Sequence, residues 1–121
     1  MSDPDFELIR ESATAVLLRE AEAGFEVLML QKAASINYGG SWVFPGGLCE
    51  DQDAASAESE FGSNDRTQVA IATVLRETQE ETGLVLSPDQ LQPFSNWLTP
   101  KLKIKRYNTL FFVAKLEAEQ A

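Results

Sequence analysis

The sequence contains no histidine and a single cysteine, Cys49. The lack of histidine excludes His-based catalytic triads, histidine zinc ligands and histidine general bases. One cysteine excludes an internal disulfide, which is typical of a reducing compartment, so we expect a cytoplasmic protein. Any chemistry must then be carried by carboxylates, lysines or a bound ion. We interpret Cys49 as a bystander, because such chemistry does not need a thiol.

The chain also lacks an apolar run near the roughly 20 residues that cross a bilayer. Its acidic start, MSDPDFELIRES, is unlike a signal or transit peptide. The net charge of -9 argues against binding to a nucleic-acid polymer, which needs a basic surface. The 121 residues have ordinary hydrophobic and charged contents of 44% and 24%. These values suit one globular domain without a membrane partner.

Short β-branched and aliphatic runs bounded by Gly and Pro predict several strands. We expect strands at 12–20, 25–33, 41–47, 84–86, 91–99 and 106–116. The continuous apolar run 27–30 indicates a strand covered on both faces. Residues 48–66, with six acids and one arginine, are expected to form a polar loop. Strands placed around one central helix predict an α+β fold.

The central helix is predicted to begin near Asp65 and to end before Gly83. Asp65 and Gln68 form a possible capping pair, and Gly83 is a typical C-cap glycine. Apolar positions at spacings of three and four predict its buried face. These positions are Ile71, Val74, Leu75 and Thr78.

The segment VLRETQEETGL gathers Glu77, Glu80 and Glu81 on one side of this helix. Like charges at this spacing destabilise a helix by roughly 0.2–0.5 kcal/mol per pair. The helix dipole also favours cations in these last turns. Such a local conflict indicates a functional site, and carboxylates without His or Cys select Mg²⁺ or Mn²⁺. Taken alone, the segment still favours the alternative, a solvated helix face.

Upstream of the helix, FPGG supplies two glycines that allow close backbone approach. Together, FPGG…RETQEETGL resembles the Nudix box of Nudix hydrolases, G-x5-E-x7-R-E-U-x-E-E-x-G-U, where U is aliphatic. Thr78 stands at a position that is usually aliphatic. The matching residues are Gly47, Arg76, Glu77, Glu80, Glu81, Gly83 and Leu84.

The box is interrupted in this chain. Gly47 and Arg76 are 29 positions apart, so about 15 residues are extra, with the insertion at roughly 54–65. Loop closure costs only about 0.6 kcal/mol per doubling of length, so both ends of the box can still meet. Asp53 stands six residues after Gly47, where the family has glutamate. Asp53, Glu58 or Glu60 could fill that role, and the sequence leaves the choice open.

The resemblance implies a fold and a reaction. The expected fold is an α/β/α sandwich in one domain, 1–121, with the catalytic helix packed on a mixed β-sheet. The expected reaction is hydrolysis of a diphosphate bond in a nucleoside-diphosphate-linked compound by water activated on Mg²⁺ or Mn²⁺. By resemblance, the metal ligands are Gly46 through its carbonyl, Glu77, Glu80 and Glu81. Glu77 and Glu80 with Arg76 form the implied catalytic set, in which Glu77 is a ligand or base and Arg76 orients the acids.

After the box, NWLTP…RYNTLFF resembles the subfamily that includes peroxisomal-type coenzyme A diphosphatases. The matching residues are Trp97, Thr99, Pro100, Arg106, Tyr107, Thr109, Phe111 and Phe112, with Asn108 in place of the usual Asp. This resemblance makes coenzyme A and its esters candidate substrates. Two alternatives stay open: a nucleotide-binding module without turnover, and a partner-binding domain whose acidic helix is solvated.

Several residues are candidates for substrate contact. They are Trp42, Gly47, Lys101, Lys103 and Arg106. Trp42, Trp97 and Tyr107 could stack on a base, although core packing is the commoner fate of aromatic residues. Alternation in PKLKIKR would place its lysines on one side of an extended segment. That side is either an anion-binding strip or a solvated strand edge.

The sequence stops at Ala121, soon after its strongest predicted strand. Nudix domains usually continue with a further strand and a helix that covers the sheet. Glu117 and Glu119 are the candidates here for the acid that the family often supplies from beyond the box. A truncated chain is one explanation. Another is that a second copy covers the exposed face, so we predict a homodimer.

Overall fold

The computed structural model describes residues 9–31, 40–100 and 106–120. Its strands are β1 (Ile9–Ala21), β2 (Gly24–Val27), β3 (Leu30–Gln31), β4 (Trp42–Val43), β5 (Gly46–Leu48), β6 (Gln92–Leu98) and β7 (Arg106–Lys115). Its helices are α1 (Asp51–Phe61), α2 (Arg66–Thr82) and a single-turn 3-10 helix (Pro88–Gln90). Among these residues no helix is both long and apolar enough to cross a membrane.

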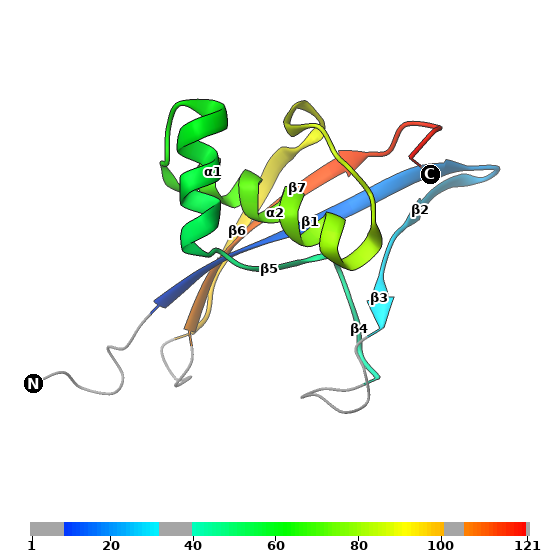
Figure 1. Ribbon diagram of the computed structural model, residues 1–121. Coiled ribbons are helices and arrows are strands. Elements are labelled where there is room, and N and C mark those ends of the chain that lie inside the picture. The colour runs from blue at the N-terminus through cyan, green and yellow to red at the C-terminus, as the bar shows by residue number, and fades with distance from the viewer. Residues whose placement is uncertain (1–8, 32–39, 101–105, 121) are drawn as a thin grey trace, which may run out of the picture.

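A mixed five-stranded sheet forms the centre of the molecule (Figure 1). Its order is β2-β1-β7-β6, and β5 also pairs with β1. Strands β1 and β7 run parallel, from Ile9 opposite Arg106 to Leu18 opposite Lys115. The other pairs in this sheet are antiparallel. Strand β7 occupies one edge of β1. Strands β2 and β5 therefore share the opposite edge of β1.

Alternation along β1 decides which face of the sheet is covered. Ala13, Ala15 and Leu17 are fully buried, and α2 contributes Ala70 and Val74 to the same core cluster. Successive strand residues point to opposite faces, so the residues between these point away from α2. Figure 1 shows both helices on the same side of the sheet. The predicted α+β fold, with a helix packed on a mixed sheet, is confirmed.

Helix α2 begins and ends as its sequence predicts. The side chain of Asp65 accepts a hydrogen bond from the Gln68 N–H at 3.0 Å. Gly83 follows the last turn with φ of 79°, a left-handed conformation that glycine adopts without steric cost. Val74 and Thr78 are fully buried, which confirms the predicted inner face.

The prediction of a polar loop at 48–66 is wrong, because most of this segment forms α1. Glu50 and Asp53 make a capping box, in which the Glu50 N–H donates to Asp53 Oδ2 at 2.8 Å. Gly62 ends the helix in a left-handed conformation. The segment lacks the apolar stripe of a typical surface helix, since its only buried residues are Asp53 and Ala57. The insertion at 54–65 is therefore largely helical.

Three strand predictions also need correction. The strand expected at 41–47 is divided into β4, which pairs with β3, and β5, which pairs with β1. Residues 84–86 form no ladder, although Leu84 and Leu86 still pack at the core cluster. The strand expected at 25–33 is divided into β2 and β3, and Val27 is 44% exposed, so this run is not covered on both faces. The strands expected near 91–99 and 106–116 are confirmed as β6 and β7.

Candidate active site

Strand β5 lies between β1 and the acidic face of α2, and it places two glycines there. A Cβ on Gly46 would overlap the carbonyl oxygen of Ala13 and lie 2.8 Å from the Cα of Thr14. A Cβ on Gly47 would instead overlap the carboxylate of Glu77. The first glycine therefore permits close contact between strands, and the second leaves room for an acid of α2. This is the physical reason for the paired glycines of FPGG.

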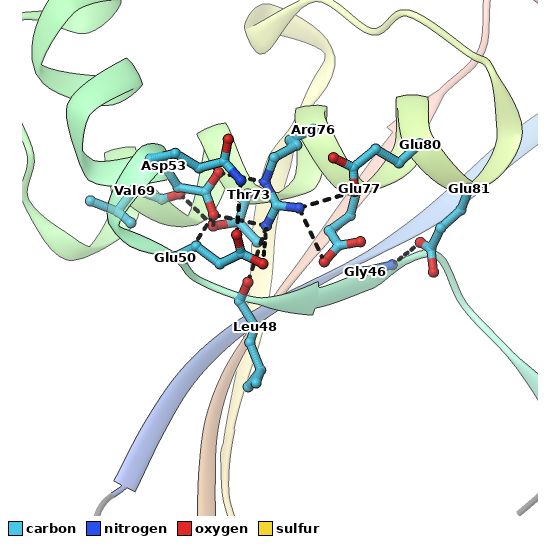
Figure 2. Close-up of polar contacts among 11 residues, drawn as sticks. Gly46, Leu48, Glu50, Asp53, Val69, Thr73, Arg76, Glu77, Glu80 and Glu81 are labelled. Carbon is cyan, nitrogen blue, oxygen red and sulfur yellow. Dashed lines mark hydrogen bonds and ion pairs between the residues drawn. The ribbon is translucent and has the colours of Figure 1, made fainter. Parts of the chain in front are cut away.

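Arg76 connects α1, α2 and β5 (Figure 2). Its Nε and Nη2 donate to the two carboxylate oxygens of Asp53 at 2.8 and 3.0 Å, a bidentate pair. Its Nη1 donates to Glu80 Oε1 at 3.1 Å and lies 3.5 Å from Glu77 Oε2. Nη2 also donates to the Leu48 carbonyl at 3.2 Å. The hydrogen bonds with Asp53 raise the pKa of Arg76, so the guanidinium stays charged.

Asp53, in the first turn of α1 and just before the insertion, is the acid that partners Arg76. Its side chain is 2% exposed, and its Oδ2 also accepts a hydrogen bond from Thr73 Oγ1 at 3.0 Å. Burial raises the pKa of Asp53, but the hydrogen bonds from Arg76, the Glu50 N–H and Thr73 outweigh it and hold that pKa below its usual range. The other two candidates, at positions 58 and 60, are exposed on α1. The structure thus brings only Asp53 of the three to Arg76.

The three acids of α2 point toward different partners. Glu81 Oε1 accepts a hydrogen bond from the Gly46 N–H at 3.0 Å, and Glu80 pairs with Arg76. The side chain of Glu77 is 17% exposed and lies between Arg76 and Gly47. Figure 2 shows the Glu77 and Glu80 carboxylates beside the Arg76 guanidinium and the Glu81 carboxylate beside Gly46.

Burial raises the pKa of Glu77. Desolvation raises the pKa of Glu77, the charge of Arg76 lowers it, and the negative charges of Glu81 and Glu80 raise it again. The net result is a raised pKa. A carboxylate with a raised pKa is a stronger base than an ordinary surface acid once it is ionised.

The acids of α2 and the backbone of Gly46 can be compared with the ligands that a divalent metal ion requires. Within the described ranges no three His, Cys, Asp or Glu side chains already converge on one point. Glu80 and Glu81 are engaged by Arg76 and by the Gly46 N–H instead. Their chemistry nevertheless fits a hard cation, because three carboxylates flank a glycine backbone. Glu80 is 57% exposed, so it can leave Arg76 without disturbing the core.

The predicted substrate residues are more scattered. Trp42 and Trp97 are 61% and 69% exposed, so the expectation that they pack in the core is wrong. Trp42 lies in β4, and Trp97 packs its ring edge-on against Phe111. Arg106 is half-buried, and its Nε donates to the Thr99 carbonyl at 3.1 Å. Lys101 and Lys103 lie outside the described residues.

Sequence reasoning missed three contributors to the site. Thr73 holds Asp53, the Leu48 carbonyl accepts from Arg76, and the Glu50 carboxylate lies 3.6 Å from Arg76. Thr73 carries no sequence signal of this role, but Glu50 and Asp53 carry a helix-start pattern that could have indicated α1. Burial raises the pKa of the half-buried Cys49 thiol, which agrees with its interpretation as a bystander.

The chain resembles a known protein family and several solved structures. A family model described as NUDIX domain matches residues 9–121. The chain superposes on a NUDIX hydrolase from Alicyclobacillus acidocaldarius with a TM-score of 0.78 and 24% identity, over 93% of this chain and 72% of that one. A MutT/nudix family protein from Enterococcus faecalis gives 0.70 and 23%, over 96% of this chain and 40% of that one.

A third structure is the NUDIX domain of Shewanella oneidensis NrtR, solved with ADP ribose. It gives a TM-score of 0.65 and 19% identity, over 97% of this chain and 66% of that one. The chain thus spans less than two thirds of the Enterococcus and Shewanella proteins. No curated protein matches the chain. At these identities the structures show a shared fold.

Proposed function

Because the chain belongs to the Nudix family, we propose that it hydrolyses a diphosphate bond in a nucleoside-diphosphate-linked compound. One observation carries the proposal: the glycines of β5 close against the acidic face of α2. Glu81 accepts from the Gly46 N–H, and Glu77 fills the space that Gly47 leaves open. Coenzyme A and its esters are the first candidate substrates, because residues 96–112 resemble the coenzyme A diphosphatase subfamily.

Mg²⁺ or Mn²⁺ on Glu77, Glu80, Glu81 and the Gly46 carbonyl would neutralise the diphosphate and lower the pKa of a bound water. Glu77 takes the proton of the water that attacks one phosphorus, and the other phosphate leaves. The Glu77 carboxylate is positioned by Arg76 at 3.5 Å. Arg76 is itself fixed by Asp53.

The test is a substrate panel with Mg²⁺ and Mn²⁺. It comprises coenzyme A, ADP-ribose, NADH, dinucleoside polyphosphates and nucleoside triphosphates. We expect turnover of at least one compound, and a loss of about 100-fold or more in kcat when a ligand is removed in Glu80→Gln or Glu81→Gln. Glu58→Gln, an exposed acid of α1, is the matched control and should act within about twofold of the wild type.

Two other outcomes are informative. Nucleotide binding without phosphate release, at every metal concentration, would favour a nucleotide-binding module. If the chain neither binds these compounds nor responds to metal, the acidic helix is a solvated face and the enzyme proposal fails.

We also propose that the sheet face opposite α1 and α2, which no helix of the described residues covers, pairs with a second copy of the chain. Phe94 and Trp97 pack on Phe111 of β7 and are 55% and 69% exposed. The face measures on the order of 500 Å², which fits a weak dimer with a small interface. In sedimentation we expect a concentration-dependent dimer that Trp97→Lys converts to a monomer. A wild-type monomer at high concentration contradicts this.

A further inference from the structure

A cavity of about 690 Å³ lies beyond the C-terminal end of α2. Its apolar wall comes from β1, from the segment after β2, from the segment after α2 and from the end of the chain. These residues are Leu17, Leu28, Met29, Leu84 and Leu116. The volume is within the range of about 300–1,000 Å³ that small-molecule sites occupy.

The cavity adjoins the candidate active site along one edge of β1. The Ala15 N–H donates to the carbonyl of Pro45, which precedes Gly46, and the Leu28 N–H donates to the carbonyl of Leu17. Ala15 and Leu17 are two residues apart, which is about 7 Å along a strand. The neighbour of Gly46 and a wall residue of the cavity are therefore consecutive partners on the same strand edge.

The helix supplies a second connection between the two places. Thr82 lines the cavity and directly follows Glu81, whose carboxylate accepts a hydrogen bond from the Gly46 N–H. Figure 1 shows the end of α2 beside β2 and β3, with β5 below the helix. A substrate whose diphosphate lies at Gly46 and Glu81 thus has the cavity within reach of its next few bonds.

Two of the polar side chains that line the cavity, Thr82 and Gln120, are already bound to other protein groups. Thr82 Oγ1 donates to the Thr78 carbonyl at 2.7 Å, and Gln120 Nε2 donates to the Val85 carbonyl at 2.8 Å. Arg19 pairs with Glu26 at 2.6 Å, and both are about half exposed. A sugar or a second nucleoside needs hydrogen-bond partners wherever the cavity removes it from water, because burying its polar groups unpaired is costly. An apolar chain needs none.

We propose that this cavity binds the apolar chain, acyl or alkyl, of a nucleoside-diphosphate-linked substrate. The proposal rests on the proposed function for the position of the diphosphate. It divides the substrate into two parts, with the diphosphate at the acidic face of α2 and the apolar chain beyond the end of that helix. Compounds whose second group is a free sugar are then poorer ligands than compounds that end in a hydrocarbon chain.

The experiment uses ADP esterified with methyl, butyl or octyl groups. Binding is measured by calorimetry with Mg²⁺, and hydrolysis is followed in parallel. Burial of each methylene is expected to lower Kd by about threefold to fourfold until the chain fills the cavity. We expect the octyl ester to bind at least ~100-fold more tightly than the methyl ester, since part of the chain stays exposed.

Two variants at one lining position test where the chain binds. Met29→Trp narrows the cavity, and Met29→Gln keeps its shape but adds a polar group; Met29 is 36% exposed, so both replacements can be accommodated. Each should reduce the gain from the octyl group by about 10-fold or more and leave the methyl ester unchanged. Val85→Trp is the control, because Val85 is 67% exposed and lies beside Leu84 outside the lining.

The failures are distinguishable. Equal affinity for all three esters overturns the cavity proposal, while hydrolysis of those esters leaves the proposed function standing. Affinity that rises with chain length without hydrolysis supports the cavity and overturns the enzymatic function. If Met29→Trp raises the melting temperature and keeps the full octyl gain, the cavity is a packing void and the proposal fails.

Discussion

Helices α1 and α2 are both rich in acids, yet they use them differently. In α1 the acids at 51, 58 and 60 are exposed, and only Asp53 is buried. In α2 the acids face a strand, where Glu77 meets Gly47 and Glu81 meets the Gly46 N–H. The comparison shows that the role of an acidic side chain depends on whether its side of the helix is exposed to solvent or packs against another element. The one buried acid of α1 serves α2, since it holds Arg76.

The largest expected difference between the helices lies in the glycines that adjoin them. Gly47→Ala forces the Glu77 carboxylate away from its place, and a displacement of about 1 Å can cost 100-fold in rate. Gly62→Ala, at the end of α1, has open space around it but a φ of 77°. It should cost about 1 kcal/mol of stability and leave kcat unchanged. Rates on the best substrate and urea unfolding of both variants check this; equal rates would refute it.

The next contrast concerns the acids of α1 themselves. Asp53→Asn removes the charge that pairs with an Arg76 side chain of only 16% exposure. We expect a loss of about 2–3 kcal/mol in the free energy of unfolding, because a partly buried guanidinium loses its main partner. Glu60→Gln, an exposed neighbour in the same helix, should change stability by less than about 0.5 kcal/mol. Chemical unfolding at neutral pH separates the two, and equal losses would show that Arg76 does not depend on Asp53.

The same pair predicts a pH dependence. The folded-state pKa of Asp53 is depressed, so its ionisation stabilises the fold above its unfolded value of about 4. This contribution is lost as the pH falls through the lower, folded-state pKa. The stability difference between wild type and Asp53→Asn should stay constant from pH 7 to about pH 5 and then shrink toward pH 3. A difference that grows on acidification would contradict the sign of the shift.

The smallest expected effect concerns the inner face of α2. Thr78 is fully buried, and its hydroxyl finds no hydrogen-bond partner in the described part of the chain. Thr78→Val keeps the shape and removes that polar group, so it should stabilise the protein by about 1 kcal/mol. Thr82→Val is the comparison, because the Thr82 hydroxyl donates to the Thr78 carbonyl. It should be neutral or destabilising, and a melting curve of each variant measures the contrast.

Prediction from sequence succeeded where the signal was local. Asp65 and Gly83 carry the capping chemistry of α2, and both lie where the pattern put them. It failed where the signal was weak or the partner distant. Helix α1 has no broad apolar face, so its acids and small residues read as a loop. Residues 84–86 are apolar enough for a strand, but no neighbouring strand pairs with them in the described structure.

Some features of the candidate site were likewise predictable from local sequence, and others depended on contacts between distant segments. The sequence by itself determined that Glu77, Glu80 and Glu81 share a helix face, because a period of 3.6 residues leaves no other arrangement. It also determined that two glycines precede them. Only the tertiary structure decided that Asp53 is the partner of Arg76 and that Gly47 leaves space for Glu77. Those contacts join residues 23 and 30 positions apart, and their geometry depends on how α1 and β5 pack against α2.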